Sequence, residues 1–280
     1  MKIKTAICLP FVLCLTTGRL ALPQLKPDEI AQRESWEQFL LSADIIKADA
    51  LGEGVTKPLK MTLRKGEVEH FAVWKNLSAG LPNGERDDWR YEIAAYRLDK
   101  LLGLQMVPVA VERTYKRKKG MLSLWMESKT NMLKMAQSGE SFPPAALAHS
   151  DKMKFITRLW DSLIANEDRT LQNIMVTEDW RVILIDHSRA FRASEMFTKN
   201  LIFGMNGLQK LPDGRGLLFK PVPRALVEKI RALDAASIMA AVGPYLTRAE
   251  IEAILARKRL ILDELEKLIA QDGEAKVLYD

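Results

Sequence analysis

Cysteine and histidine are the scarcest reactive residues of this chain. Only two of its 280 residues are cysteines, Cys8 and Cys14, and both lie near the N-terminus. Removal of that segment leaves no cysteine, which excludes disulfide bonds and thiol catalysis from the mature protein. The three histidines, His70, His149 and His187, are too scattered to form a zinc-binding pattern. A Gly-x-Ser-x-Gly element is also missing, which argues against a serine hydrolase.

Strong net charge, internal repeats and low-complexity tracts are missing as well. The net charge is only +6, and basic and acidic residues are interleaved along the chain. This pattern does not indicate nucleic-acid binding, so no nucleic-acid partner is expected. Hydrophobic residues make up 48% of the chain and charged residues 28%, which is typical of a globular protein and excludes a disordered one. The length suffices for one two-lobed domain or two small domains.

The N-terminus has the pattern of a signal peptide. Lys2 and Lys4 supply a positive start, an apolar run at residues 6–15 follows, and small residues then provide a cleavage site. We therefore expect a signal peptide at residues 1–18, with cleavage as late as residue 21, and an exported protein, periplasmic or secreted. The apolar run is too short for a transmembrane helix, so no stable membrane span is expected in the mature chain. The proline within the run disfavours the alternative of an N-terminal core helix.

Residues 45–127 are expected to form a strand-rich lobe. The residue pattern predicts two hairpins, formed by residues 60–64 with 68–74 and by residues 107–111 with 121–126. Between them, residues 89–102 have the periodicity of a helix, which Gly103 would end. The tip of the second hairpin, residues 116–120, is strongly basic, and a solvated turn is its simplest interpretation.

Residues 128–280 are predicted to form a mainly helical lobe. Its first part, residues 128–148, contains Ser, Asn, Gly and two prolines and is expected to link the two lobes. Ser150 is a suitable N-cap for the helix that follows. Thr247 and Glu250 fit the capping box of a long C-terminal helix. A strand-rich lobe followed by a helical lobe predicts an α+β protein with a cleft between the lobes.

Three polar residues, Asp168, Asn173 and Asp186, carry the chemistry that the sequence indicates. Strands at residues 174–177 and 181–185 would bring Asn173 and Asp186 opposite each other at the open end of a hairpin, with Cβ atoms roughly 5 Å apart. An amide oxygen and a carboxylate at that separation can share one Mg²⁺ ion. Asp168, on the preceding loop, would be a second carboxylate suited to accept the proton of an attacking hydroxyl. Each residue alone is better explained as a turn cap or a strand end, but the three together favour phosphoryl transfer.

The segment that contains these residues resembles the catalytic and metal-binding loops of atypical kinases. It has D-R-x-x-x-N followed by I-D-H-S-R-A-F, and it is similar to bacterial kinase-like proteins that resemble phosphatidylinositol 3-/4-kinases, HipA-like kinases and secretory-pathway kinases. The resemblance implies a two-lobed protein-kinase-like fold. It also implies that Asp168 is the catalytic residue and that Asn173 and Asp186 are metal ligands. Thr170 departs from the histidine that many relatives have after D-R.

The resemblance extends upstream to four further residues. Gly52 and Gly54 lie in a segment that looks like the glycine-containing loop over the nucleotide phosphates. Lys75 is similar to the phosphate-binding lysine of kinases, and Glu92 resembles the glutamate that pairs with that lysine. Without the family pattern, two glycines two residues apart more often form an ordinary turn, and Lys75 and Glu92 would be surface charges.

A function follows from this resemblance, with alternatives. It implies an ATP-dependent phosphotransferase that uses Mg²⁺ or Mn²⁺ and moves the γ-phosphate to a hydroxyl of a protein, glycan or small molecule. One alternative is a kinase-fold module that binds nucleotide or a partner without catalysis. Another is transfer of AMP in place of phosphate. The expected partner is an acceptor that carries a hydroxyl group.

Overall fold

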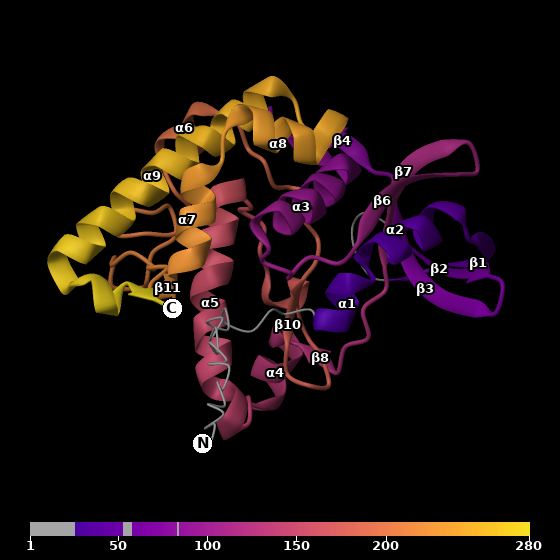
Figure 1. Ribbon diagram of the computed structural model, residues 1–280, viewed down its shortest axis with the longest axis horizontal. Helices are drawn as coiled ribbons and strands as arrows, with labels where there is room; N and C mark the ends of the chain where they lie inside the picture. Colours follow the sequence, from indigo (N-terminus) through magenta and orange to yellow (C-terminus); the bar gives the residue numbers. More distant parts are fainter. Residues whose placement is uncertain (1–25, 53–57, 83) are drawn as a thin grey trace, which may run out of the picture.

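The computed structural model describes residues 26–52, 58–82 and 84–280, which form two lobes (Figure 1). The N-terminal lobe contains an antiparallel sheet with the strand order β1–β2–β3–β7–β6. Its strands are β1 (Asp44–Ala50), β2 (Leu59–Lys65), β3 (Val68–Lys75), β6 (Ala110–Tyr115) and β7 (Lys118–Leu124). Alternate side chains of β2 and β3, such as Met61 and Ala72, are fully buried, as expected for a sheet with one covered face. Helix α3 (Trp89–Leu102) packs against β6 and β7.

Two helices before the sheet connect the lobes. They are α1 (Pro27–Ala31) and α2 (Arg33–Ser42), and both precede residue 45, where the strand-rich lobe is expected to begin. Helix α2 packs on β6 and β7, and Arg113 of β6 donates a hydrogen bond of 2.6 Å to a carbonyl just after α2. Helix α1 lies near β8 and β10 of the other lobe (Figure 1), where Glu29 is 2.7 Å from Nη1 of Arg181. The N-terminal segment therefore contacts both lobes.

The C-terminal lobe is mainly helical. Its two longest helices, α5 (Pro144–Ile164) and α9 (Arg248–Asp272), pack against each other (Figure 1). The other helices of this lobe are α4 (Met132–Ser138), α6 (Glu195–Lys199), α7 (Arg224–Ala232), α8 (Ala235–Val242) and the 3-10 helices η1 (Leu171–Asn173), η2 (Gly243–Tyr245) and η3 (Glu274–Lys276). This lobe also contains a small sheet of order β10–β9–β8, and Met175 of β9 and Leu184 of β10 line a cavity between the lobes.

The remaining strands are short. Those of the small sheet are β8 (Thr130–Asn131), β9 (Ile174–Val176) and β10 (Val182–Leu184). The antiparallel pair β4 (Ser78–Gly80) and β5 (Arg86–Asp88) leads from β3 into α3, and β11 (Val222–Pro223) pairs with β12 (Leu278–Tyr279) near the C-terminus. The α+β class and the two-lobed organisation are therefore confirmed.

Several expectations about local structure are also confirmed. Helix α3 spans the predicted residues 89–102 and ends at Gly103, whose φ of 66° is left-handed and suits glycine. The predicted hairpin of β2 and β3 forms, with its turn at Gly66-Glu67, one residue after the expected Lys65-Gly66. Thr247 and Glu250 form the predicted capping box of α9. These elements share strong local signals, which tertiary contacts did not override.

Three local predictions are wrong. Helix α5 begins at Pro144 rather than after Ser150, because proline is well suited to the first helical turn, where its missing N–H is not needed. Residues 128–148 are therefore not a linker, since they contain β8, α4 and the first turn of α5.

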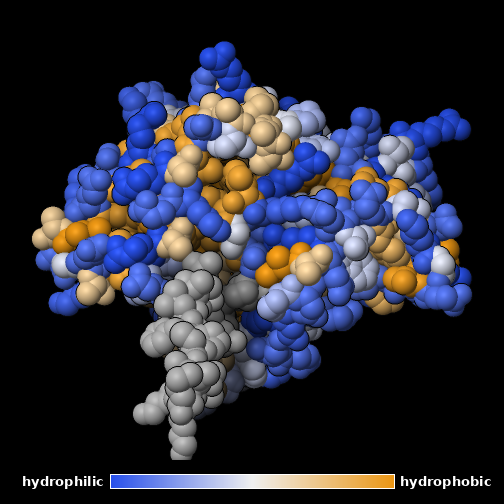
Figure 2. Space-filling view, viewed as in Figure 1, coloured by the Kyte–Doolittle hydropathy of each residue, from blue (hydrophilic) through white to orange (hydrophobic). Residues whose placement is uncertain are grey.

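The hairpin of β6 and β7 turns at Lys116-Arg117, and both residues have a positive φ. Most of the predicted basic tip, residues 116–120, therefore belongs to β7. Figure 2 shows this hairpin end as a hydrophilic projection.

The predicted export signal at residues 1–18 lies outside the described residues, as does Gly54. Among the helices that the structure describes, none is long and apolar enough to cross a membrane.

Candidate functional site

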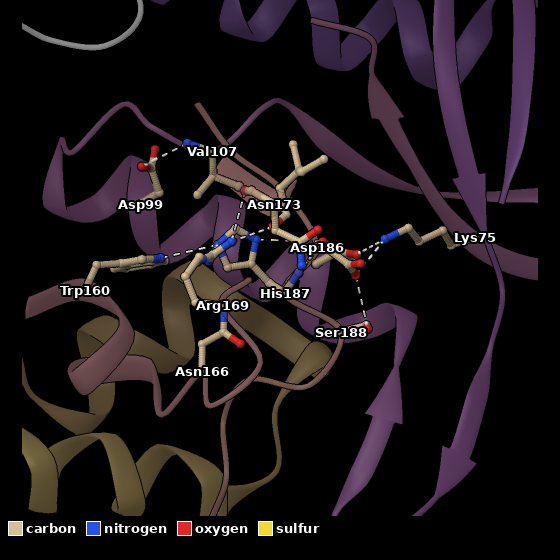
Figure 3. Close-up of polar contacts among 12 residues, drawn as sticks. Lys75, Asp99, Val107, Trp160, Asn166, Arg169, Asn173, Asp186, His187 and Ser188 are labelled. Atoms are coloured by element: carbon tan, nitrogen blue, oxygen red, sulfur yellow. Dashed lines mark hydrogen bonds and ion pairs between the residues drawn. The ribbon is translucent and has the colours of Figure 1, made fainter. Parts of the chain in front are cut away.

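Lys75, the last residue of β3, makes two ion pairs in the cleft between the lobes (Figure 3). Its Nζ lies 2.7 Å from Oε1 of Glu92 and 2.8 Å from Oδ1 of Asp186. Glu92 belongs to the first turn of α3, whereas Asp186 follows β10 in the other lobe. The side chains of Lys75 and Glu92 are 12% and 7% exposed. The cluster therefore joins the lobes through nearly buried charges.

The charges of this cluster stabilise one another. Burial disfavours the ammonium form of Lys75, but Glu92 and Asp186 outweigh that effect and raise the pKa of Lys75 above its ordinary value. Burial disfavours the carboxylate form of Glu92, but Lys75 and His187 outweigh it and hold the pKa of Glu92 well below its ordinary value. Lys75 is therefore a cation and Glu92 an anion at neutral pH.

Backbone hydrogen bonds fix Glu92 against the segment that contains Asp186. The second carboxylate oxygen of Glu92, Oε2, accepts the backbone N–H of His187 at 2.9 Å. Asp88, the buried N-cap of α3, donates its own N–H to the carbonyl of Ser188 at 2.8 Å. Both oxygens of Glu92 thus have partners, and the start of α3 cannot move without breaking contacts to residues 187–188. The position of the cluster is determined by these two connections.

Arg169 organises the loop that contains Asp168, and sequence reasoning gave it no role. Its Nε and Nη2 donate to the buried carboxylate of Asp161 at 3.2 and 3.1 Å. Its Nη1 donates to the carbonyl of Ile185 at 2.6 Å, and Nη2 lies 2.9 Å from Nε2 of His187 (Figure 3). One guanidinium therefore connects α5 with the end of β10. Its place beside Asp168 in the D-R pair was the only signal in the sequence.

His187 is a buried structural residue of this network. Its Nε2 accepts hydrogen bonds from Arg169 and from Nε1 of Trp160, the latter at 3.3 Å. Burial, together with the charge of Arg169, lowers the pKa of His187, so the imidazole is neutral. Because Nε2 accepts, the ring proton belongs on Nδ1, which lies 3.8 Å from Oε2 of Glu92. The ring is fully buried, which leaves it no access to a substrate.

Asp168 lies on the loop after α5 with its side chain 44% exposed. The guanidinium of Arg189 approaches it, with Nη1 3.4 Å from Oδ2 of Asp168. The Nε of the same guanidinium donates to Oδ2 of Asp87 at 2.9 Å. Arg189 and Asp87 were not assigned from the sequence, because they are 102 residues apart and nothing in either segment indicates the pairing.

The predicted pairing of Asn173 with Asp186 is wrong by one residue. Strands β9 and β10 pair Ile174 with Leu184, so Asn173 faces Ile185 and accepts its N–H at 3.1 Å. Asp186 is the next residue, and its φ of 58° is left-handed, a conformation that non-glycine residues rarely adopt. Asn173 and Asp186 nevertheless belong to adjacent backbone segments (Figure 3).

An apolar cavity of about 130 Å³ adjoins the charged cluster. Lys75, Glu92 and Asp186 lie on its wall, and the rest of its lining is mostly apolar: Val73, Val107, Pro108, Ala110, Met121, Leu124, Trp125, Met126, Met175, Leu184 and Ile185. A flat aromatic group with a charged tail fits such a site, because the ring is buried and the tail meets the cluster. Gly52 follows β1 with a φ of 66°, in the connection between β1 and β2.

The oxygen atoms near the cluster suit a hard divalent cation. Lys75 and Ser188 contact Oδ1 of Asp186, which leaves Oδ2 without a partner among the described residues. No group of three or more His, Cys, Asp or Glu side chains in the described part of the chain is arranged to hold a metal ion. Asn173 and Asp186 alone therefore fit Mg²⁺ or Mn²⁺ only with additional oxygen ligands, such as phosphate and water.

Comparison with known proteins agrees with this architecture. No protein-family profile and no curated protein matches the sequence. Among solved structures, hydra Fam20 with sugar superposes with a TM-score of 0.61 at 16% identity, over 91% of this chain and 93% of that one. The Helicobacter pylori proinflammatory kinase CtkA gives a TM-score of 0.47 at 12% identity, over 80% of this chain and 93% of that one. The similarity to Fam20 shows a kinase-like fold.

Proposed function

We propose that this chain, with its kinase-like fold, is an ATP-dependent phosphotransferase. The observation that carries the proposal is the lysine held by two carboxylates, Glu92 from one lobe and Asp186 from the other. Such a lysine is a fixed cation for phosphate oxygens, and preorganised charges of this kind are the main contribution that proteins make to phosphoryl transfer. The apolar cavity beside Lys75 is a suitable place for the purine ring of ATP, which supports the proposal.

Each residue of the site has a role in the proposed mechanism. Asp168 accepts the proton of the acceptor hydroxyl while that oxygen bonds to the γ-phosphorus. The bond from this phosphorus to the bridging oxygen breaks, and ADP leaves with the electron pair. Lys75 binds phosphate oxygens and Glu92 keeps it in position. Asn173 and Asp186 would hold Mg²⁺ or Mn²⁺, which neutralises phosphate charge. The acceptor is a hydroxyl-bearing protein, glycan or small molecule.

The place of Gly52 in the chain supports a role for the glycine loop, and the hydrogen bonds of Arg169 support a role for its network. Gly52 begins the connection between β1 and β2, next to the strand that leads to Lys75, so this connection is our candidate for the cover of the phosphates. Gly54 would belong to the same cover. Arg169 would keep the loop of Asp168 in register with residues 185–187.

Substitution of the two aspartates tests the proposal. Labelled γ-phosphate should be transferred from ATP by the wild type in the presence of Mn²⁺ or Mg²⁺, to itself or to an added acceptor mixture. Asp168→Asn and Asp186→Asn should each lower that transfer by at least roughly a hundredfold, since general-base and metal-binding contributions are each of that order. Asp213→Asn is the matched control, because Asp213 is exposed and, within the described part of the chain, pairs only with Arg215. Equal incorporation by all four proteins would refute the proposal.

Label in the α-phosphate and measurement of the melting temperature distinguish the two alternatives from phosphoryl transfer. If the protein transfers AMP, label in the α-phosphate is incorporated and label in the γ-phosphate is not, and the intact mass of the acceptor shows a nucleotidyl adduct. If the protein is a binding module without catalysis, ATP raises its melting temperature in a metal-dependent way but neither label is transferred. Thr170, which stands where many relatives have a histidine after D-R, favours this second alternative.

We also propose that residues 1–18 direct export of the protein. The support is the sequence pattern of that segment, with two lysines before an apolar run. N-terminal sequencing of the protein purified from its natural host tests this directly. A mature N-terminus between residues 19 and 22 is expected, whereas a retained Met1 would contradict export by cleavage.

A further inference from the structure

Arg189 lies between acidic side chains of the two lobes, Asp87 and Asp168. Its Nε is 2.9 Å from Oδ2 of Asp87, and its Nη1 is 3.4 Å from Oδ2 of Asp168. The charge of Asp186 also acts on this guanidinium. The side chain of Arg189 is 35% exposed, so it is accessible to a ligand from solvent. A cation thus borders both the proposed base and the proposed metal ligand.

The two contacts of this guanidinium differ in strength. The contact with Asp87 is a hydrogen bond to a carboxylate that is only 5% exposed. The contact with Asp168 is a longer ion pair with a carboxylate that is 44% exposed, and solvent weakens such pairs. Asp87 is therefore the anchor, and the contact with Asp168 is the one that a stronger anion can replace. A phosphate matches the planar fork of arginine better than a single half-exposed carboxylate oxygen does.

Asp87, which holds Arg189, lies in the same chain segment as Glu92 of the Lys75 cluster. Asp87 precedes the N-cap of α3, and Glu92 follows five residues later in the same rigid segment. Ser188, next to Arg189 in the chain, accepts the N–H of Asp88 and contacts Asp186 (Figure 3). The guanidinium is 3.4 Å from the proposed base Asp168 and is also under the charge of the proposed metal ligand Asp186, so it is near both ends of the proposed transfer from ATP to an acceptor.

We propose that Arg189 binds the γ-phosphate of ATP, exchanging its contact with Asp168 for this phosphate while Asp87 retains Nε. This inference rests on the proposed function. The exchange has a consequence for the base: Asp168 becomes free to accept the proton of the acceptor hydroxyl only when a γ-phosphate is bound. Arg189 is thus a second phosphate-binding cation beside Lys75, and Asp87 is its positioning residue.

The ratio of affinities for two nucleotides tests this proposal. Dissociation constants would be measured with Mn²⁺ for ADP and for an ATP analogue whose β–γ bridge is an imido group. Arg189→Ala should weaken the analogue roughly tenfold or more, because a charge-assisted hydrogen bond is lost, and should leave ADP unchanged. Asp87→Asn should reduce the same preference, though less, because the guanidinium remains but loses its anchor. Arg215→Ala, an exposed arginine paired with an aspartate elsewhere, should retain the wild-type ratio.

Two other outcomes would contradict either the role of Arg189 or the proposed function itself. If Arg189→Ala keeps the wild-type ratio of affinities, or weakens ADP and the analogue equally, Arg189 does not bind the γ-phosphate and the inference fails while the proposed function stands. If the wild type binds neither nucleotide with Mn²⁺, the proposed function itself fails and the inference with it. A melting temperature of the free Arg189→Ala protein near that of the wild type ensures that a lost preference is not the result of unfolding.

Discussion

Replacement of Glu92 by glutamine should destabilise the protein far more than an exposed replacement of the same kind. Glu92 is 7% exposed and accepts two hydrogen bonds, from Lys75 at 2.7 Å and from the N–H of His187 at 2.9 Å. Glutamine keeps the size of the side chain, but it removes the charge opposite Lys75 and directs an NH₂ donor at one of the two existing donors. Breaking a buried ion pair on one side costs about 3–5 kcal/mol. We expect Glu92→Gln to lose about 3 kcal/mol of unfolding free energy, because Asp186 remains as a partner of Lys75.

Urea unfolding at pH 7 measures this loss, and Glu252→Gln is the matched control. Glu252 likewise pairs with a basic residue, Arg248, at 2.8 Å, but the two side chains are 60% and 89% exposed. Such a pair contributes less than about 1 kcal/mol. The buried replacement should therefore be at least about 2 kcal/mol more destabilising than the exposed one. Equal unfolding free energies for the two variants would refute the reasoning, because burial would then not matter.

The pH dependence of the same comparison gives a second check. Because the pKa of Glu92 in the folded protein is held below its unfolded value, the unfolded chain binds more protons as the pH falls. The stabilisation by Glu92 is therefore complete above its ordinary pKa of 4.5 and is lost as the pH falls from there through the folded pKa. The difference between wild type and Glu92→Gln should shrink below about pH 4.5 and stay constant from about pH 5.5 to 8. A difference that grew on acidification would have the wrong sign.

Three further predictions concern the supports of the site. Arg169→Lys should cost about 2–4 kcal/mol in urea unfolding, because an ammonium cannot replace the fork that holds a buried carboxylate and a carbonyl; a loss below about 0.5 kcal/mol would contradict this. Arg181→Ala removes the ion pair with Glu29 that connects α1 to the small sheet. If this pair contributes about 1 kcal/mol to the docking of α1, limited proteolysis of residues 26–43 should become roughly fivefold faster. An unchanged cleavage rate would show that α1 is held by other contacts. Gly120→Ala places a Cβ 2.5 Å from the carbonyl of Lys75, so β7 must shift from β3 at a cost of about 1–3 kcal/mol, measured as a lower melting temperature.

Local signals in the sequence determined much of the architecture. The periodic apolar residues of α3 with Gly103 at its end, and the capping box at Thr247, depend on residues within one or two turns of each other, so they can be recognised without tertiary context. Lys65-Gly66 likewise has the composition of a turn between two strands. The start of α5 was misjudged because Pro143 and Pro144 are common both in linkers and at helix starts, and only packing distinguishes the two.

The site itself was only partly accessible from the sequence. The Asp168, Asn173 and Asp186 segment is short, so its spacing is visible along the chain, but its register is not. Strands β9 and β10 pair Val176 with Val182, so their turn places Asn173 opposite Ile185, and Asp186 lies one residue further on, in a left-handed conformation that no local pattern requires. Resemblance to kinases, rather than spacing, indicated Lys75 and Glu92, and the structure brings both to Asp186.

Only the tertiary structure decided which charges meet. Lys75 and Asp186 are 111 residues apart, and Arg189 and Asp87 are 102 residues apart, so their pairing depends on how the two lobes pack. An exposed arginine and an arginine between two acids look the same in a sequence, because the difference lies in burial and in partners from other elements. The sequence therefore determined the elements and the chemical type of the site. The fold determined its charge network, because ion pairs form between side chains that folding brings together.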